Sequence, residues 1–209
     1  MIQIETGTYL VGLASFEHTV PPFHPNTAAN DICRAFFKLK EAFERYRQLE
    51  KQWPTSGDAP LFPLPIVAGA KRKIDSATPF IAVDCGAAPG GWTKYLHTVC
   101  DEVYAIDPVD MHADVSSLPR VRHLKMMAAR AVPALREILA RRDGAVALWV
   151  SDMCVHDLTS QVDALLQARR AVPFRPEAAF VVTIKCNVGH GRARFDQLAA
   201  AEAQRLREA

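Results

Sequence analysis

The sequence predicts an α/β domain built on a mainly parallel, Rossmann-like sheet. From residue 80 onward, short runs of apolar and β-branched residues alternate with segments of helical periodicity, which is typical of strands joined by crossover helices. The first of these runs leads directly into a glycine-rich turn at Gly86 to Gly91. The chain has 209 residues, of which 49% are hydrophobic and 23% charged, and this suits one soluble globular domain.

The first 52 residues predict an extension that packs on this core. Two short strands are expected within residues 2–15, and a proline-rich connector that cannot be helical follows them. A helix is expected from Asn30 or Asp31 to about Glu50, because apolar residues recur there at helical spacing. Residues 53–79 are rich in proline and glycine and predict a long surface loop.

Residues 80–209 predict the core itself. Strands are expected at residues 80–84, 102–107, 121–124, 145–152 and 179–185. Helices are expected at residues 92–99, 128–142, 161–172 and 193–208.

Composition excludes several classes of protein. No apolar run reaches the roughly 18 residues that a membrane span needs. The five cysteines are scattered, and no Cys or His spacing suits zinc, so we expect reduced thiols and no metal. The N-terminus lacks the features of a secretory signal, which favours an intracellular, cytoplasmic protein and leaves nucleus and mitochondrion open. The net charge of +2 means that any nucleic acid must be met by local basic patches.

The glycine-rich turn predicts a cofactor site. It follows a buried strand, and Asp107 ends the next strand, where a carboxylate can accept both hydroxyls of a ribose. A dinucleotide fingerprint would need glycine in place of Ala88, and Pro89 has no amide for phosphate. A cofactor without phosphate, such as S-adenosylmethionine, is therefore favoured over a dinucleotide or a purely structural turn.

Four segments resemble one known family. Residues 84–92, DCGAAPGGW, look like the DLGAAPGGW motif of FtsJ-type RNA 2′-O-methyltransferases. Residues 34–42 are similar to the family's upstream SRAxxKLxE helix, with Cys33 in place of the serine. Ser151-Asp152-Met153 and Thr183-Ile184-Lys185 resemble the ends of its fourth and fifth strands, and the resemblance covers about residues 30 to 198. In detail, KLKEAF at 38–43 and GGWT at 90–93 are closer to the RlmM-type ribosomal RNA methyltransferases.

The resemblance implies a class I methyltransferase fold and transfer of a methyl group from S-adenosylmethionine to a ribose 2′-hydroxyl of RNA, with ribosomal RNA as the expected substrate. It assigns the catalytic positions to Lys38, Asp152 and Lys185. Lys185 would accept the proton, Lys38 would orient the hydroxyl, and Asp152 would lie by the cofactor and position Lys185. Physical chemistry agrees, because a ribose hydroxyl is a poor nucleophile and a lysine acts as a base only when its pKa is lowered.

Further residues are expected to bind the cofactor or the RNA. The cofactor set is Cys33, Asp84, Gly86, Ala88, Pro89, Gly90, Gly91, Trp92, Asp107, Met127 and Asp152. For Trp92, a role in packing the core is as well supported as a contact with the cofactor. The RNA set is Lys71, Arg72, Lys73, Arg192 and Arg194, although basic clusters are more often solvated surface.

Two departures from the family pattern set further expectations. Residues 124–128, LKMMA, lack the acid that family members place after the third strand, so adenine should be held by apolar contact and backbone. The usual last two strands and a late glutamate are missing, which predicts five strands in the order 3-2-1-4-5 without a closing hairpin. The chain is then either a fragment or works with three catalytic residues. The alternative function is a non-catalytic RNA-binding or ribosome-assembly factor, and the oligomeric state cannot be read from the sequence.

Overall fold

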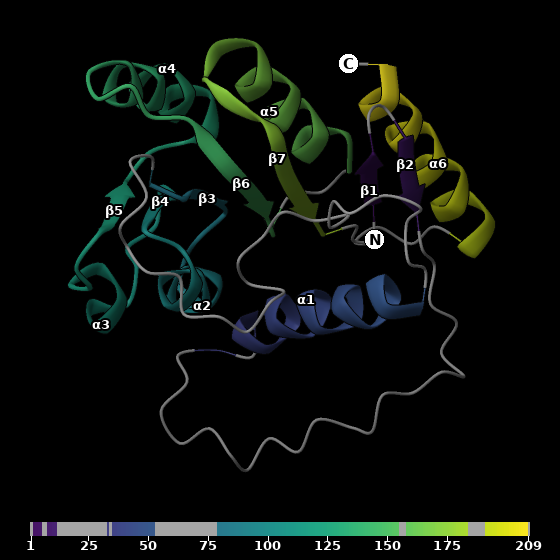
Figure 1. Cartoon of the computed structure of the whole chain (residues 1–209), viewed down its shortest axis with the longest axis horizontal. Helices are drawn as coiled ribbons and strands as arrows, with labels where there is room; N and C mark the ends of the chain where they lie inside the picture. Colours follow the sequence, from purple (N-terminus) through teal and green to yellow (C-terminus); the bar gives the residue numbers. More distant parts are fainter. Residues whose placement is uncertain are drawn as a thin grey trace.

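Five parallel strands form the central sheet of the computed structural model (Figure 1), which describes residues 2–5, 8–11, 33, 35–52, 79–154, 158–183 and 191–208. The strands are β3 (Ile81–Cys85), β4 (Glu102–Ile106), β5 (Val121–Leu124), β6 (Val146–Ser151) and β7 (Phe174–Val182). Their order is β5-β4-β3-β6-β7, and every neighbouring pair is parallel. Counted from the first strand of the core, this is the predicted order 3-2-1-4-5, which is confirmed.

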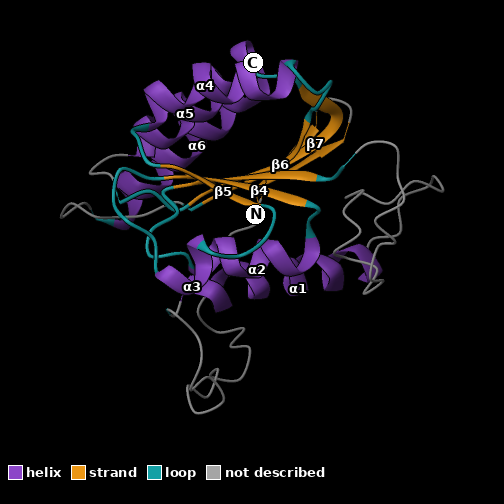
Figure 2. Ribbon diagram, turned by 90° about the vertical axis from the view of Figure 1, so that its left-hand side faces the viewer, coloured by secondary structure: helices purple, strands orange, loops and turns teal. Residues whose placement is uncertain are grey.

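Helices cover both faces of the sheet (Figure 2). One face carries α4 (Ala128–Ala140), α5 (Leu158–Ala171) and α6 (Arg192–Glu208). The other carries α1 (Ala35–Gln52), α2 (Gly91–Val99) and the four-residue α3 (Ala113–Ser116). An antiparallel hairpin of β1 (Ile2–Glu5) and β2 (Thr8–Val11) lies beyond the sheet, with β1 against β7 and β2 against α6. No helix in the described ranges is both long and apolar enough to cross a membrane.

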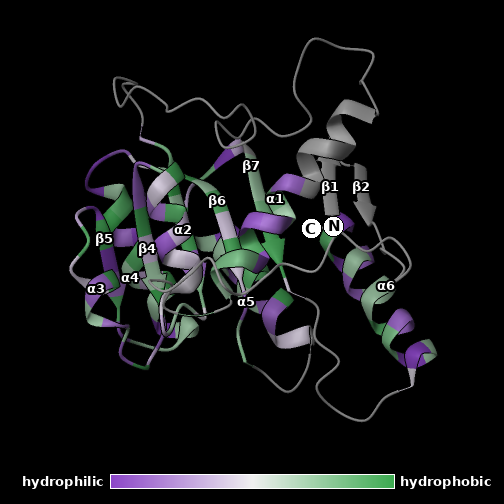
Figure 3. Cartoon of the chain, turned by 90° about the horizontal axis from the view of Figure 1, so that it is seen from below, coloured by the Kyte–Doolittle hydropathy of each residue, from purple (hydrophilic) through white to green (hydrophobic). Residues whose placement is uncertain are grey.

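Apolar side chains fill both layers between sheet and helices. On the side of α4 and α5, Trp149 and Tyr104 are fully buried and pack with Leu135 and other helix residues. On the side of α1 and α2, Leu148 packs with Leu39 and other helix residues. Neighbouring residues of β6 thus point to opposite faces, as expected of a strand covered on both sides. Figure 3 shows the matching pattern in α5 and α6, whose turns carry both hydrophilic and hydrophobic residues.

Several predicted boundaries were wrong. The first helix starts at Ala35, not at Asn30 or Asp31, and Cys33 is not helical. The last strand starts at Phe174, not at residue 179, because Phe174 pairs with Val146 before a break in the register. This early part contains a proline, which an edge strand tolerates because one side of it needs no hydrogen-bond donor. The short helix α3 was not predicted. The predicted loop at residues 53–79 lies outside the described residues, except for Pro79.

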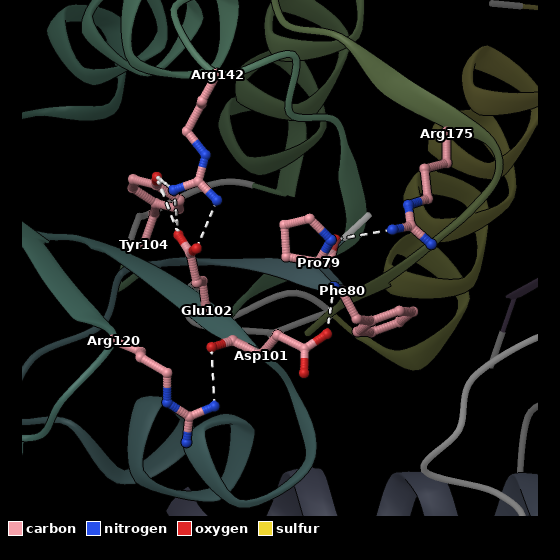
Figure 4. Close-up of polar contacts among 8 residues, drawn as sticks. All are labelled: Pro79, Phe80, Asp101, Glu102, Tyr104, Arg120, Arg142 and Arg175. Carbon is pink, nitrogen blue, oxygen red and sulfur yellow. Dashed lines mark hydrogen bonds and ion pairs between the residues drawn. The ribbon is translucent and has the colours of Figure 1, made fainter. Parts of the chain in front are cut away.

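Polar contacts stabilise the edge of the sheet where the strands begin (Figure 4). Arg142, just after α4, donates to Glu102 of β4 at 2.6 Å. Asp101 accepts from the Phe80 amide at 2.6 Å and so joins the starts of β3 and β4. Two further arginines donate to backbone carbonyls in this region, Arg120 to Asp101 and Arg175 to Pro79. These groups bond to one another within the fold. Ligands of open parallel sheets bind at the opposite edge, beyond the carboxyl ends of the strands.

Helices α1 and α2 meet at Gly91. A Cβ at this position would collide with Sγ of Cys33 and lie 2.9 Å from the backbone nitrogen of Phe36. Tyr95 of α2 extends the contact, with ring centroids 5.4 Å from Phe36 and 5.9 Å from Phe43. The start of α1 therefore lies directly on the start of α2, which only a glycine permits.

We expect Gly91→Ala to lower the free energy of unfolding by about 1–3 kcal/mol, because the added methyl group overpacks a contact that includes backbone atoms. Gly191→Ala is the matched control, since a Cβ there meets nothing within 4 Å. Urea denaturation of the two variants and the wild type measures the effect. Equal stability of the two variants would contradict the role of Gly91 in docking α1.

Candidate active site

The glycine-rich turn between β3 and α2 lies at the centre of the sheet, at the edge where the parallel strands end. β3 has β4 on one side and β6 on the other. The helices that follow β4 and β6, α3 and α5, lie on opposite faces of the sheet (Figure 2), so a ligand crevice is expected beyond the strand ends at this point. Ligands of open parallel sheets bind in this crevice.

Two glycines of the turn have backbone conformations that other residues rarely adopt. Gly86 has φ of 86° and Gly90 has φ of 118°, a region that glycine adopts without strain. A Cβ on Gly86 would lie 2.7 Å from Cα of Met153, and one on Gly90 would lie 2.9 Å from the Val115 side chain. The chain after β6 therefore crosses close to the turn, and this crossing brings Asp152 into the crevice.

The first three backbone amides of the turn, those of Gly86, Ala87 and Ala88, are engaged within the protein. Gly86 and Ala87 both donate to the carbonyl of Ile106, at 2.9 and 3.2 Å. Ala88 donates to Oδ2 of Asp107 at 3.1 Å, and Pro89 has no amide hydrogen. A dinucleotide site needs such amides for pyrophosphate, so this turn suits a cofactor without phosphate.

Asp107 is held in a defined orientation after β4. Its Oδ2 accepts from the Ala88 amide, and its Oδ1 accepts from the Val109 amide at 2.8 Å. Each carboxylate oxygen can accept more than one hydrogen bond. The group can therefore still accept the two hydroxyls of a ribose placed beside the turn.

Asp84 is a buried acid with an unused acceptor. Its side chain is fully buried, and Oδ2 accepts from the Thr93 hydroxyl at 2.7 Å. Within the described part of the chain, no group donates to Oδ1. Burial raises the pKa of this carboxyl to about 7, and the charges of Asp152 and Asp107 act in the same direction, while the Thr93 hydrogen bond opposes them. A donor such as the ammonium of S-adenosylmethionine, directly or through water, would fit this acceptor.

Lys38 and Asp152 come together at the site. Lys38 projects from α1, and its Nζ lies 3.8 Å from Oδ2 of Asp152, which directly follows β6. The lysine side chain is 60% exposed and the aspartate 13% exposed, so the pair lies at an accessible mouth. Lys185 lies outside the described residues, but Thr183, two residues earlier, donates its amide to the Ser151 carbonyl at 2.8 Å.

Two exposed apolar residues follow the strands on the β4 side of the turn. Val109 is 62% and Met127 is 63% exposed, and they are the large hydrophobic side chains most open to solvent among the described residues. They follow the neighbouring strands β4 and β5. Lys125, close to where the family has its acid, forms an ion pair with Asp110 at 2.6 Å. Met127 was among the predicted residues. Val109 was not among them, and its place two residues after Asp107 makes it a further candidate.

The remaining predicted residues have varied surroundings. Trp92 is 5% exposed and packs in the core beneath α1, and Cys33 borders Gly91. Arg192 and Arg194 are exposed at the start of α6, with Nε of Arg192 3.9 Å from Asp196. Lys71, Arg72 and Lys73 lie outside the described residues. In the ranges described, no three His, Cys, Asp or Glu side chains gather as metal ligands would.

We expect Asp84→Asn to reduce the dependence of stability on pH. In the folded protein the pKa of Asp84 is about 7, whereas the ordinary pKa of an aspartate is 3.8. The stability from this proton is complete below about pH 4 and is lost as the pH rises toward about 7. Over this range the free energy of unfolding should fall less in Asp84→Asn than in the wild type.

Urea denaturation at several pH values measures this change. Thr93→Val should have the opposite effect and serves as the control. The Thr93 hydrogen bond lowers the pKa of Asp84, so its loss should increase the fall of the free energy of unfolding with pH. Parallel pH profiles for the wild type and Asp84→Asn would show that Asp84 does not titrate differently on unfolding.

Comparison with known proteins agrees with this geometry. The FtsJ-like methyltransferase family matches residues 32–186. A proposed hemolysin from Lactococcus lactis has a similar fold, with a TM-score of 0.52 and 16% identity over 85% of this chain and 73% of its own. A proposed hemolysin from Streptococcus thermophilus has a TM-score of 0.54 and 17% identity over 83% of this chain and 56% of its own. No curated protein matches the chain.

At these identities the two solved structures are similar in fold alone, and the family match carries the assignment. It spans most of the chain and includes Lys38, the glycine-rich turn and Asp152. The occupied amides of Gly86 to Ala88 and the unused acceptor of Asp84 suit the family's cofactor. This chain therefore belongs to the FtsJ-like methyltransferase family, whose methyl donor is S-adenosylmethionine.

Proposed function

We propose that this methyltransferase acts on a ribose 2′-hydroxyl of RNA, with ribosomal RNA as its substrate. The observation that supports this most is the approach of Lys38 Nζ to Asp152 Oδ2, 3.8 Å apart beside the glycine-rich turn. A cation and a carboxylate at the accessible mouth of a cofactor crevice suit a substrate that must be oriented and lose a proton.

The proposed roles follow from the chemistry of the hydroxyl. Lys185 accepts the proton from the 2′-oxygen, because a neutral amine is the base that this set of residues can provide. Lys38 donates a hydrogen bond to the same oxygen and orients it. Asp152 holds the two amines near each other, and their mutual repulsion favours the neutral form of one. S-adenosylmethionine supplies an electrophilic methyl group on a sulfonium.

Cofactor contacts are proposed on both sides of the turn. Asp84 and Asp107 provide carboxylates, while Gly86 to Trp92 and Cys33 line the turn. Val109 and Met127 hold the adenine between apolar side chains, in place of the acid that the sequence lacks. Lys125 and Asp110, which are close to them in the sequence, pair with each other.

RNA is proposed to contact the basic residues next to the site. Arg192 and Arg194 are exposed and follow the segment that contains Lys185. Lys71, Arg72 and Lys73 are proposed to add phosphate contacts. Such contacts release counterions, so RNA affinity should fall steeply with salt.

The finer classification also remains a proposal. The KLKEAF and GGWT segments and Cys154 after Asp152-Met153 support the RlmM type of ribosomal RNA methyltransferase. With this assignment we propose three parts of the chain: an N-terminal extension at 1–52, a loop at 53–79 and a catalytic core at 80–209. The enzyme is proposed to be cytoplasmic and to use no metal.

Lys38→Met and Lys185→Met should each lower the rate of methyl transfer to RNA by about 10²- to 10⁴-fold, because each removes a group that handles the hydroxyl proton. Tritium transfer from labelled S-adenosylmethionine to RNA from cells lacking the protein measures the rate. Lys40→Met is the matched control, because Lys40 lies on the same helix, is 46% exposed and pairs with Glu44.

Mass spectrometry of the digested RNA should identify a 2′-O-methylnucleoside. A methylated base would overturn the ribose assignment. RNA binding without transfer by the wild type would instead favour the non-catalytic RNA-binding alternative.

Met127→Ala should weaken binding of S-adenosylhomocysteine by about three- to tenfold, because apolar surface that the adenine covers is lost. Isothermal titration measures this affinity. The analogue with hypoxanthine in place of adenine should bind the wild type with an affinity within about threefold of that of S-adenosylhomocysteine. The reason is that, in this proposal, no acid accepts a hydrogen bond from the amino group of adenine. A difference in affinity of about a hundredfold would show that a polar group binds the amino group of adenine. It would contradict the proposed apolar binding by Val109 and Met127.

A further inference from the structure

A buried glutamine in α5 joins the ends of two strands. Gln161 is 1% exposed, and both ends of its amide are used. Its Oε1 accepts from the Ser151 hydroxyl at 2.8 Å, and its Nε2 donates to the Thr183 carbonyl at 2.9 Å. The Thr183 amide donates in turn to the Ser151 carbonyl at 2.8 Å. Three hydrogen bonds thus form a closed ring through one helix and two strand ends.

The partners of Gln161 directly precede the proposed catalytic residues. Ser151 is the last residue of β6, is fully buried, and stands next to Asp152 in the chain. Thr183 follows the last residue of β7 and precedes Lys185 by two residues. The ring therefore lies where the chain leaves the sheet on its way to both residues.

Packing alone does not explain a glutamine at this position. Val162 and Leu165 on the same helix are buried and apolar, and an apolar residue at 161 would fill the same space. A buried glutamine requires hydrogen bonds to offset the loss of water, and these bonds are directional. They define the relative position of β6 and β7 more closely than apolar contact does.

We propose that Gln161 is a positioning residue for methyl transfer, which holds the ends of β6 and β7 together so that Asp152 and Lys185 enter the site in register. The inference rests on the proposed function for its catalytic consequence, while the anchoring of the strand ends stands on the hydrogen bonds alone. Gln161 acts through Ser151 and Thr183 and does not need to touch the substrate.

A second polar contact of α5 serves as the comparison. Thr159 donates to Oε1 of the buried Glu202 at 2.8 Å, and Glu202 accepts from Arg205 at 2.6 Å. The first bond joins α5 to α6, the second lies within α6, and neither involves Ser151 or Thr183. Thr159→Val therefore removes a hydrogen bond from the same helix without disturbing the ring.

The kinetic test compares Gln161→Met with Thr159→Val, using tritium transfer to RNA from cells lacking the protein. Gln161→Met should lower kcat by about ten- to a hundredfold, because small displacements of catalytic groups have large effects, with KM for cofactor and RNA within about threefold. Thr159→Val should leave kcat unchanged. Ser151→Ala removes one bond of the ring, and the double variant should be little worse than Gln161→Met, because both act on one network. An unchanged kcat in Gln161→Met would overturn the proposal.

Hydrogen exchange tests the anchoring without RNA or cofactor. In the wild type, the Asp152 amide donates to the Cys85 carbonyl at 3.2 Å and the Thr183 amide to Ser151. Both amides should exchange faster in Gln161→Met, whereas amides in β3 and β4 keep their protection. Ser151→Ala provides a milder variant if Gln161→Met does not fold.

The two measurements distinguish the two ways of failing. If the wild type transfers no methyl group to RNA but the exchange pattern is as expected, the proposed function fails and the anchoring stands. If the strand ends stay protected in Gln161→Met, the anchoring fails, whatever the activity.

Discussion

The close approach of two chain segments to one turn is the constraint on which the site depends. Between β3 and α2, a side chain at Gly86 would collide with the segment after β6, and one at Gly91 would collide with the start of α1. The first of these segments carries Asp152, and the second leads into Lys38. Because both contacts include backbone atoms, they leave no room to adjust. The same turn that offers a cofactor its cradle therefore also sets the distance between the proposed catalytic residues.

Electrostatics around this turn favours a cationic ligand. Asp84, Asp107 and Asp152 lie close enough for the latter two to raise the pKa of the first. Lys38 is largely exposed and approaches only one of them. S-adenosylmethionine carries a sulfonium and an ammonium, so its binding would relieve the repulsion among the carboxylates. A dinucleotide would add negative charge in the same place, where the turn has no free amides at Gly86 to Ala88 to receive it.

The most predictable parts of the molecule were those with local signals. The strands of the core were recognised by their apolar runs, and the turn between β3 and α2 by its glycines. The start of α1 was misplaced, because it depends on where Cys33 must pass Gly91, a contact across distant parts of the chain. The early start of β7 was missed for a similar reason. The strand begins early because Phe174 pairs with Val146 of β6 before the register shifts to Leu148 and Ala179, and nothing in the composition of residues 174–178 indicates this pairing.

The sequence by itself determined the fold class, the strand order, the family and the type of cofactor, because these depend on periodicity and on a long motif that a chain carries locally. Only the tertiary structure decided which side chains meet. Lys38 lies 3.8 Å from Asp152, and Gln161 bonds to both strand ends. Such contacts join residues far apart in the chain, and their distances are set by how helices and strands pack, which no spacing along the sequence records.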